Sequence, residues 1–331
     1  MKSALLCLAF TIFGQVAVNA QTETYAEKLG FPKGKKVVIF HVDDAGMSYE
    51  SNVGTINAMD KGIASSTSVM MPCGWVPNFF EYVKKHPTAD VGVHLTLTSE
   101  WNGYRWSPLV GREKAPGLYD EQGAFWHSVE QVVQHASADE VEAEIRAQLA
   151  RYRAFGVQPT HMDSHMGTLF DPKFIMRYAK VAIEEKIPVL FPAGHATLIF
   201  KANNVPAPMQ QLAQQVGKQL WDAGLPVMDD LDGTSYGWTL PAGTPVTDAT
   251  IQKYKTQKFI ELLKSTKPGL TYIIMHCTAP SPTFDQISGS GQSRNGDMLA
   301  MMDPALKSFV EKEGIIITTW RELMERRKKV N

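Results

Sequence analysis

The sequence predicts an α/β fold in which about seven parallel strands form a closed or nearly closed barrel. Short apolar runs typical of strands alternate along the chain with longer runs typical of helices, which is the pattern of a parallel sheet covered by helices. The strand-like runs are apolar, as expected when both faces of a sheet are buried. No Gly-x-Gly-x-x-Gly motif follows the first predicted strand, which argues against an open dinucleotide-binding sheet.

The predicted elements follow one another in a regular order. The strands cover residues 36–41, 66–71, 90–98, 159–164, 189–192, 269–277 and 314–319. The helices cover residues 49–61, 78–85, 137–156, 172–185, 251–264 and 304–313, and a last helix begins near Trp320. The helix that begins at Ser137 opens with a Ser-x-x-Glu capping box.

Residues 194–250 do not follow this alternation. They hold a possible helix at 209–223 and the segment DDLDGTSYGW, in which we interpret Asp229, Asp230 and Asp232 as turn residues. We expect an elaboration at the rim of one barrel domain that spans residues 21–331. We also interpret residues 289–293, GSGQS, as a loop.

The first twenty residues have the pattern of a secretory signal peptide. Lys2 precedes an apolar core, and small residues precede the expected cleavage site after Ala20. The core is too short to cross a bilayer, and no later stretch resembles a membrane span. We therefore expect a periplasmic or extracellular protein. Whether Cys73 and Cys277 pair there is left open.

The net charge of −1 offers no basic surplus for nucleic acid. The sequence does not indicate an oligomeric state.

Two adjacent carboxylates, Asp43 and Asp44, follow the first predicted strand. Like charges this close cost free energy unless a positive charge lies between them or one of them takes a proton. A metal ion would supply that positive charge. Since the other ligands of such an ion should follow other strands at the same end of the barrel, the histidines at those positions are the candidates.

The segment THMDSHMG, residues 160–167, offers His161 and His165. In an extended strand two residues four apart lie roughly 13 Å from each other, too far for both to bind one ion. His94 lies on the more polar face of the strand at 90–98 and is a further candidate. One carboxylate and two imidazoles suit a catalytic divalent ion. His276, which ends another strand, could serve as a general acid.

Four motifs together resemble the YdjC-like carbohydrate deacetylases, the family that includes the chito-oligosaccharide deacetylase group. They are VDDAGMS (42–48), GVHLTLT (92–98), PTHMDSH (159–165) and MHCTAP (275–280). The resemblance extends from about residue 36 to residue 321. It implies a distorted TIM-like barrel and metal-dependent removal of acetyl groups from carbohydrate.

The resemblance also implies roles for single residues. Asp44, His94 and His165 match the metal ligands, Asp43 the catalytic base and His276 the acid. His161 would lie behind the ligands or in the substrate site. Zinc fits these ligands, and magnesium is the other main candidate, with manganese, cobalt and nickel as further possibilities.

A long loop at 99–126 is rich in aromatic residues. Its residues Trp101, Tyr104, Arg105 and Trp106 are candidates for sugar binding, because aromatic faces stack on sugar rings and arginine binds hydroxyl or carboxylate groups. The alternative is a loop that packs around a small core of its own.

The sequence therefore predicts an exported, metal-dependent carbohydrate deacetylase that acts on acetylated sugars or oligosaccharides. The alternatives are an O-acetyl esterase or phosphoesterase on the same barrel, or a sugar-binding protein without catalysis.

Overall fold

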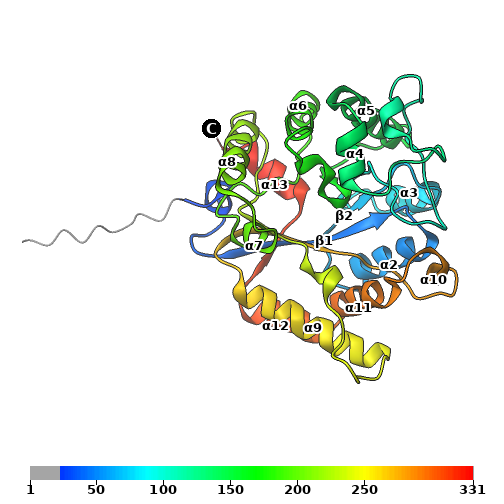
Figure 1. Ribbon diagram of the computed structural model, residues 1–331. Coiled ribbons are helices and arrows are strands. Elements are labelled where there is room, and N and C mark those ends of the chain that lie inside the picture. The colour runs from blue at the N-terminus through cyan, green and yellow to red at the C-terminus, as the bar shows by residue number, and fades with distance from the viewer. Residues whose placement is uncertain (1–22, 331) are drawn as a thin grey trace, which may run out of the picture.

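The structure is a computed structural model that describes residues 23–330 (Figure 1). The predicted signal peptide lies outside these residues. A seven-stranded parallel sheet has the spatial order β4-β3-β2-β1-β6-β5, and β7 pairs with the first half of β1. The strands are β1 (Lys36–Ala45), β2 (Ser66–Val69), β3 (Val91–Leu95), β4 (Met162–Ser164), β5 (Asp230–Asp232), β6 (Gly269–Met275) and β7 (Ile316–Ile317).

Helices cover the outer face of this sheet (Figure 1). The first half of the chain contributes α1 (Tyr25–Lys28), α2 (Tyr49–Asp60), α3 (Val76–Lys85), η1 (Pro116–Leu118), α4 (Val129–His135), α5 (Ala138–Arg153) and η2 (His165–Phe170). The second half contributes α6 (Ile175–Glu185), α7 (Thr197–Ala202), α8 (Ala207–Asp222), η3 (Thr234–Gly237), α9 (Asp248–Ser265), α10 (Phe284–Ile287), α11 (Gly291–Met301), α12 (Pro304–Lys312) and α13 (Trp320–Arg327).

The sheet curls into a half-barrel, which confirms the α/β prediction and is consistent with a TIM-like arrangement. Residues 189–192, predicted as a strand, make only isolated parallel bridges, Met162 to Val189 and Pro192 to Met228. These bridges extend the backbone pairing from β4 toward β5. Residues 189–192 therefore join β4 to β5 through isolated backbone bridges and do not form a regular strand.

The two faces of β1 have different partners. Val38, Phe40 and Val42 pack outward against α9, α11 and α12, where they are completely buried. Val37 and Ile39 point inward, into a cluster with Tyr272 and Trp320. Because side chains alternate along a strand, the next inward positions belong to His41 and Asp43. The interior of the curl is therefore apolar at its amino-terminal end and polar toward the carboxyl ends of the strands.

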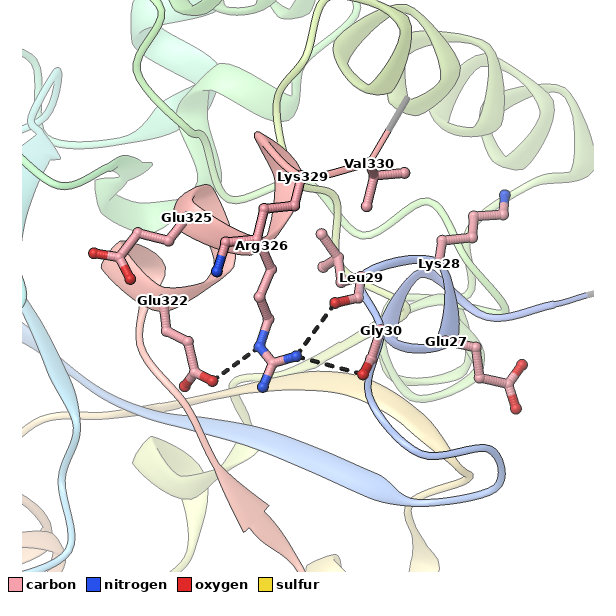
Figure 2. Close-up of a pocket in the computed structure, with 9 residues that line it drawn as sticks. All are labelled: Glu27, Lys28, Leu29, Gly30, Glu322, Glu325, Arg326, Lys329 and Val330. Atoms are coloured by element: carbon pink, nitrogen blue, oxygen red, sulfur yellow. Dashed lines mark hydrogen bonds and ion pairs between the residues drawn. The ribbon is translucent and has the colours of Figure 1, made fainter.

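Helices α1 and α13 close the amino-terminal end of the curl. Arg326 of α13 binds Glu322 at 2.9 Å and reaches the carbonyl groups of Leu29 and Gly30, both at 3.4 Å. Figure 2 shows these contacts in a surface hollow between the two helices. Arg326 and Glu322 form an ion pair in this hollow, whereas the predicted catalytic residues lie at the opposite ends of the strands.

Several predicted elements are confirmed, and two interpretations are wrong. The Ser137–Glu140 capping box opens α5 as expected. Asp230 and Asp232 belong to β5 rather than to a turn, and two aspartates in a three-residue strand hide the apolar signal. Asp230 is buried there because it accepts hydrogen bonds from the first backbone N–H groups of α7. Residues 289–293 are not only a loop, since α11 begins at Gly291.

Both cysteines, Cys73 and Cys277, are buried and free. Among residues 23–330, no helix is long and apolar enough to cross a membrane.

Candidate metal centre and active site

The end of β1 brings two consecutive carboxylates to the same side. Asp44 has a φ of 67°, a left-handed conformation that residues other than glycine rarely adopt. The register with β2 shifts between Val42 and Ala45, as it does at a β-bulge. The alternation of side chains is interrupted here, so Asp43 and Asp44 both reach the mouth of the curl. Both lie 3.9 Å from Nε2 of His276, measured from their Oδ2 atoms.

Asp44, His94 and His165 form a compact triangle of candidate ligands. Nε2 of His94 lies 3.3 Å from Oδ1 of Asp44, and Nδ1 of His165 lies 3.4 Å from the same oxygen. The two imidazole nitrogens are 3.2 Å apart. Ligand atoms about 2.0–2.1 Å from a tetrahedral zinc ion are about 3.3 Å from one another. The triangle therefore matches one face of such a coordination sphere.

The hydrogen bonds of Asp44 support this assignment. Its Oδ2 accepts a hydrogen bond from Nη1 of Arg294 at 2.7 Å. Its Oδ1, which faces both imidazoles, is buried and has no hydrogen-bond partner. A buried carboxylate oxygen without a donor costs free energy, and a cation would remove that cost. The residues present therefore fit a divalent metal ion.

Each imidazole of the triangle has a carboxylate behind it. Nδ1 of His94 is hydrogen-bonded to Oδ1 of Asp163 at 2.7 Å. Nε2 of His165 lies 3.1 Å from Oε2 of Glu100. Carboxylates in this position fix the orientation of metal-binding histidines and make them more basic.

The charges around the triangle favour a cation. Burial lowers the pKa of His165, but Glu100 and Asp44 outweigh burial and raise this pKa to about 9. Burial raises the pKa of Asp44, yet Arg294 and the two histidines hold it well below its usual range. The carboxylates thus stabilise positive charge on the imidazoles, and a divalent ion would satisfy the same carboxylates.

Asp43 and His276 lie beside the triangle rather than in it. Oδ2 of Asp43 is 3.8 Å from Nε2 of His94, and Oδ1 of Asp43 is 3.1 Å from Nε2 of His41. His276 follows β6, and its side chain is 17% exposed. Burial and then Arg294 lower the pKa of His276, which makes its protonated form a readier proton donor. The structure thus brings together all five residues predicted for the metal and for catalysis.

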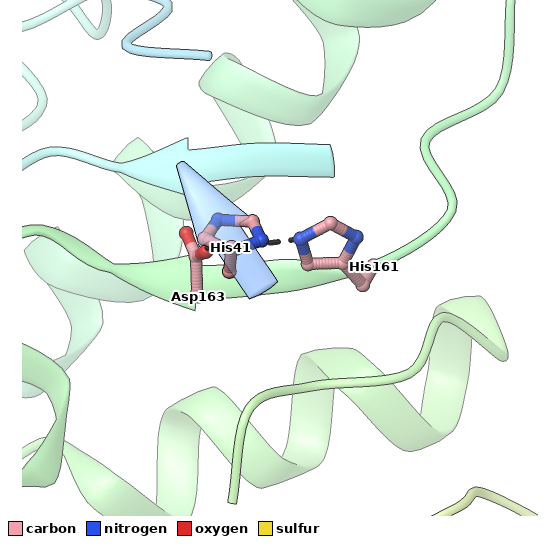
Figure 3. A group of neighbouring side chains, drawn as sticks. All are labelled: His41, His161 and Asp163. Atoms are coloured by element: carbon pink, nitrogen blue, oxygen red, sulfur yellow. Dashed lines mark ion pairs between the residues drawn. The ribbon is translucent and has the colours of Figure 1, made fainter. Parts of the chain in front are cut away.

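A second group of buried residues, His41, His161 and Asp163, lies deeper in the curl (Figure 3). Nε2 of His41 is 2.9 Å from Oδ2 of Asp163, and its Nδ1 is hydrogen-bonded to Ser66. His161 is completely buried and stacks on Trp320 with ring centroids 5.1 Å apart. It therefore lies behind the site and has no surface to offer a substrate.

The aromatic loop is packed around its own contacts. Arg105 binds Asp120 at 2.6 Å and donates to the carbonyl group of Phe125. Trp106 is 5% exposed, and its indole N–H donates to Thr98. Tyr104 donates to the carbonyl group of Met47. Two of the four candidates border the site: the ring centroid of Trp101 is 5.8 Å from Cζ of Arg294, and the rings of Trp106 and His165 have centroids 6.4 Å apart.

A family model described as YdjC-like protein matches residues 37–312 of this chain. The chain belongs to the YdjC-like family. A carbohydrate deacetylase of Thermus thermophilus is 30% identical over 300 residues, which are 90% of this chain and 97% of the relative. A chitooligosaccharide deacetylase of Yersinia enterocolitica is 28% identical over 287 residues, which are 85% of this chain and 96% of the relative.

A crystal structure shows the same fold. It is that of an Enterococcus faecalis V583 protein whose name refers to cellobiose-phosphate cleavage. The two structures superpose with a TM-score of 0.68 at 22% identity, over 87% of this chain and 99% of the other.

Three residues of this YdjC-like site were missed by the sequence analysis. Asp163 shares the inward face with His161 and His165, so the strand alternation could have indicated it. Glu100 follows the strand that carries His94, but exposed carboxylates are common after strands. Arg294 lies 250 residues from Asp44 on α11, whose first residues were interpreted as part of a loop, and no local pattern points to it.

Proposed function

We propose that this YdjC-like chain is an exported, metal-dependent carbohydrate deacetylase on a distorted TIM-like barrel. The Asp44–His94–His165 triangle, with its unpartnered carboxylate oxygen, carries the metal part of the proposal. The names of the relatives support the carbohydrate part. The spacing of the ligand atoms and the two imidazoles favour zinc over magnesium, which prefers oxygen ligands.

The proposed reaction is hydrolysis of an acetyl amide on a sugar. A divalent ion held by the triangle would supply Lewis acidity and would lower the pKa of a water molecule that it binds. Asp43 lies beside the triangle with no role in it, so its carboxylate is free to take a proton from the attacking water. His276 then gives a proton to the leaving nitrogen as the C–N bond breaks. The products are acetate and the free amino sugar.

The surroundings of Asp43 suit a base that keeps its place. Nε2 of His41 lies 3.1 Å from Oδ1 of Asp43, and Nε2 of His276 lies 3.9 Å from its Oδ2. The carboxylate can therefore receive a proton without leaving the site. Arg294 binds Asp44 rather than Asp43, which keeps the two carboxylates in different roles.

Acetate release tests the proposed function. N-acetyl-chito-oligosaccharides, O-acetylated glycans and a generic phosphate ester would be compared, each with and without a chelator. We expect acetate from the N-acetyl substrates and loss of this activity with the chelator. Release of phosphate from the phosphate ester alone would contradict the proposal, and release of acetate from O-acetylated glycans alone would make the chain an esterase.

The variant Asp43→Asn tests whether Asp43 acts as the general base or as a metal ligand. We expect turnover to fall by about 10²–10⁴, the usual contribution of a general base, while the metal content stays at the wild-type level. The matched control is Asp222→Asn on the surface of α8, which should change neither. If Asp43→Asn loses the metal as well, Asp43 is a ligand and the base lies elsewhere.

Export is the part of the proposal that rests on the leader sequence alone. Cell fractionation of the full-length chain and the mass of the mature protein would test it. A periplasmic or extracellular protein that begins after Ala20 is expected, and an uncleaved cytoplasmic chain would contradict it.

A further inference from the structure

An apolar cavity of about 500 Å³ lies beside the metal triangle. Its walls come from η2, residues 190–192, α7, α8 and the ends of β5 and β6. In Figure 1, α7 and α8 lie on the same flank of the molecule, and both line this cavity. They belong to the segment after residue 194 that did not fit the sequence pattern. The elaboration at the rim therefore builds a binding space.

The cavity opens over the interior of the curl. Leu190 and Leu231, which line it, belong to the inward cluster that also contains Tyr272. Ile274 lines it too, one inward step beyond Tyr272 on β6. The next residue on the same side of β6 is His276. The mouth of the curl is thus polar on the side of β1 and β3, and apolar on the side of β5 and β6.

The cavity borders directly on the ligand His165. Ser164 and Met166, its two neighbours in the chain, both line the cavity. Met166 has a φ of 51°, and its side chain is in contact with Thr98, 3.3 Å from Sδ to Oγ1. Met166, which is 50% exposed, therefore stands at the border between the cavity and His165.

The lining favours a hydrocarbon chain over a sugar ring as the occupant. No charged side chain is found among the described residues that line the cavity. Its polar side chains are already bonded, Ser164 to the N–H of Leu169 and Asn203 to the carbonyl group of Ile199. Sugar hydroxyl groups would lose their hydrogen bonds to water without replacement, which costs free energy. By contrast, the surface hollow in Figure 2 is lined mainly by charged side chains.

We propose that this cavity binds the hydrocarbon chain of an acyl group longer than acetyl on an amino sugar. The inference rests on the proposed function, because the carbonyl group of that acyl chain must lie at the triangle. A dry cavity of about 150 Å³ holds benzene, so this one is large enough for a chain of about eight carbons. The reaction is amide hydrolysis: water supplies the oxygen of the released carboxylic acid and a proton to the amine as the C–N bond breaks.

The test compares acyl chains on one sugar. The values of kcat/KM of the metal-loaded protein would be measured for N-acetyl-, N-butanoyl- and N-octanoylglucosamine. Each buried methylene should raise kcat/KM by about fourfold, so the value for the octanoyl substrate should exceed that for the acetyl substrate by at least about tenfold. Equal or lower values for octanoyl, with acetyl still hydrolysed, would overturn the cavity assignment and leave the proposed function intact.

Two variants on α8 locate the effect. Met209 lines the cavity, and Met209→Glu places a charge in it. The ratio of octanoyl to acetyl kcat/KM should fall to about one, since the chain would have to be buried beside a carboxylate. Gln211→Glu adds the same charge to an exposed position of the same helix and should keep the wild-type ratio. A wild-type ratio in Met209→Glu contradicts the proposal.

A binding measurement tests the cavity even if the protein hydrolyses none of these substrates. If none of the three amides is hydrolysed, the proposed function fails, and calorimetry of the metal-loaded protein decides on the cavity. Binding of N-octanoylglucosamine at least about tenfold tighter than N-acetylglucosamine, lost in Met209→Glu, would support it. Equal affinity for the two ligands would overturn it.

Discussion

Two groups of buried histidine and aspartate with no residue in common lie in the described part of the chain, and a third group, Asp43, His94 and Asp163, takes one residue from each of them. The upper group is Asp44, His94 and His165, and the lower group is His41, His161 and Asp163. Both hold two imidazoles and one carboxylate, and both are almost completely buried. Residue types and burial therefore do not distinguish them.

Hydrogen bonding does distinguish them. In the upper group one carboxylate oxygen is left without a donor between two imidazole nitrogens. In the lower group both oxygens of Asp163 are occupied, Oδ1 by His94 and Oδ2 by His41 and Tyr272. The carboxylate of the lower group is therefore fully bonded, and the one unpartnered atom of that group is Nε2 of His161, 3.7 Å from Oδ2 of Asp163. The upper group lacks one positive charge.

The same contrast separates His161 from His165, which lie in one motif. His161 precedes β4, with its ring between Trp320 and the interior of the curl. After β4 the chain turns, because Met166 and Gly167 both have positive φ values, 51° and 67°. His165 lies at the mouth just before this turn, where its two ring nitrogens are near Glu100 and His94. Identical side chains four residues apart therefore reach different environments.

Metal content is the largest expected difference between the groups. His165→Ala removes a proposed ligand, and we expect the protein to lose its metal and its activity. His161→Ala is the matched control and should keep a wild-type metal content, because His161 touches no ligand atom of the triangle. Element analysis after dialysis measures both. Loss of metal from His161→Ala alone would move the metal site to the lower group.

Asp163 joins the two groups, and its replacement has a smaller expected effect. Asp163→Asn keeps the size of the side chain but removes the charge that orients His94. Metal affinity should fall by about 10–100-fold, the usual effect of losing such a carboxylate. A competition titration against a chromogenic chelator would measure it. Glu100→Gln, behind the other imidazole, should act in the same direction, and unchanged affinity in both variants would contradict the assigned roles.

Much of this contrast was accessible from the sequence. Strand alternation placed His94 on the inward face, and the ends of two strands pointed to Asp43, Asp44 and His276. The choice between His161 and His165 was not accessible from spacing, since it depends on a turn at Met166 that no local residue pattern required. The family resemblance made that choice.

Long-range contacts account for what was missed. Arg294 reaches Asp44 from α11, and β5 is recognisable only through its pairing with β6. The polar residues of β5 fit a sheet because Asp230 caps α7, a contact that depends on the tertiary fold. Local propensity cannot report a hydrogen bond that forms only after the curl has closed.

The packing of the lower group offers the smallest and most selective test. A Cβ atom at Gly92 would lie 2.5 Å from Cε1 of His161, so glycine at this inward position makes room for the imidazole. Gly92→Ala should lower the free energy of unfolding by about 1–3 kcal/mol, as overpacking usually does. Urea unfolding of metal-free protein measures it without a contribution from metal binding.

A second variant decides whether the imidazole causes this cost. In a His161→Ala background the clash is absent, and alanine fits a strand better than glycine by about 0.5–1 kcal/mol. The same Gly92→Ala change should then be neutral or stabilising, so the two substitutions couple strongly. An equal cost in both backgrounds would mean that the ring of His161 does not fill the space above Gly92. The lower group would then be loosely packed, and the close approach of Gly92 to His161 would not be what holds that imidazole in place.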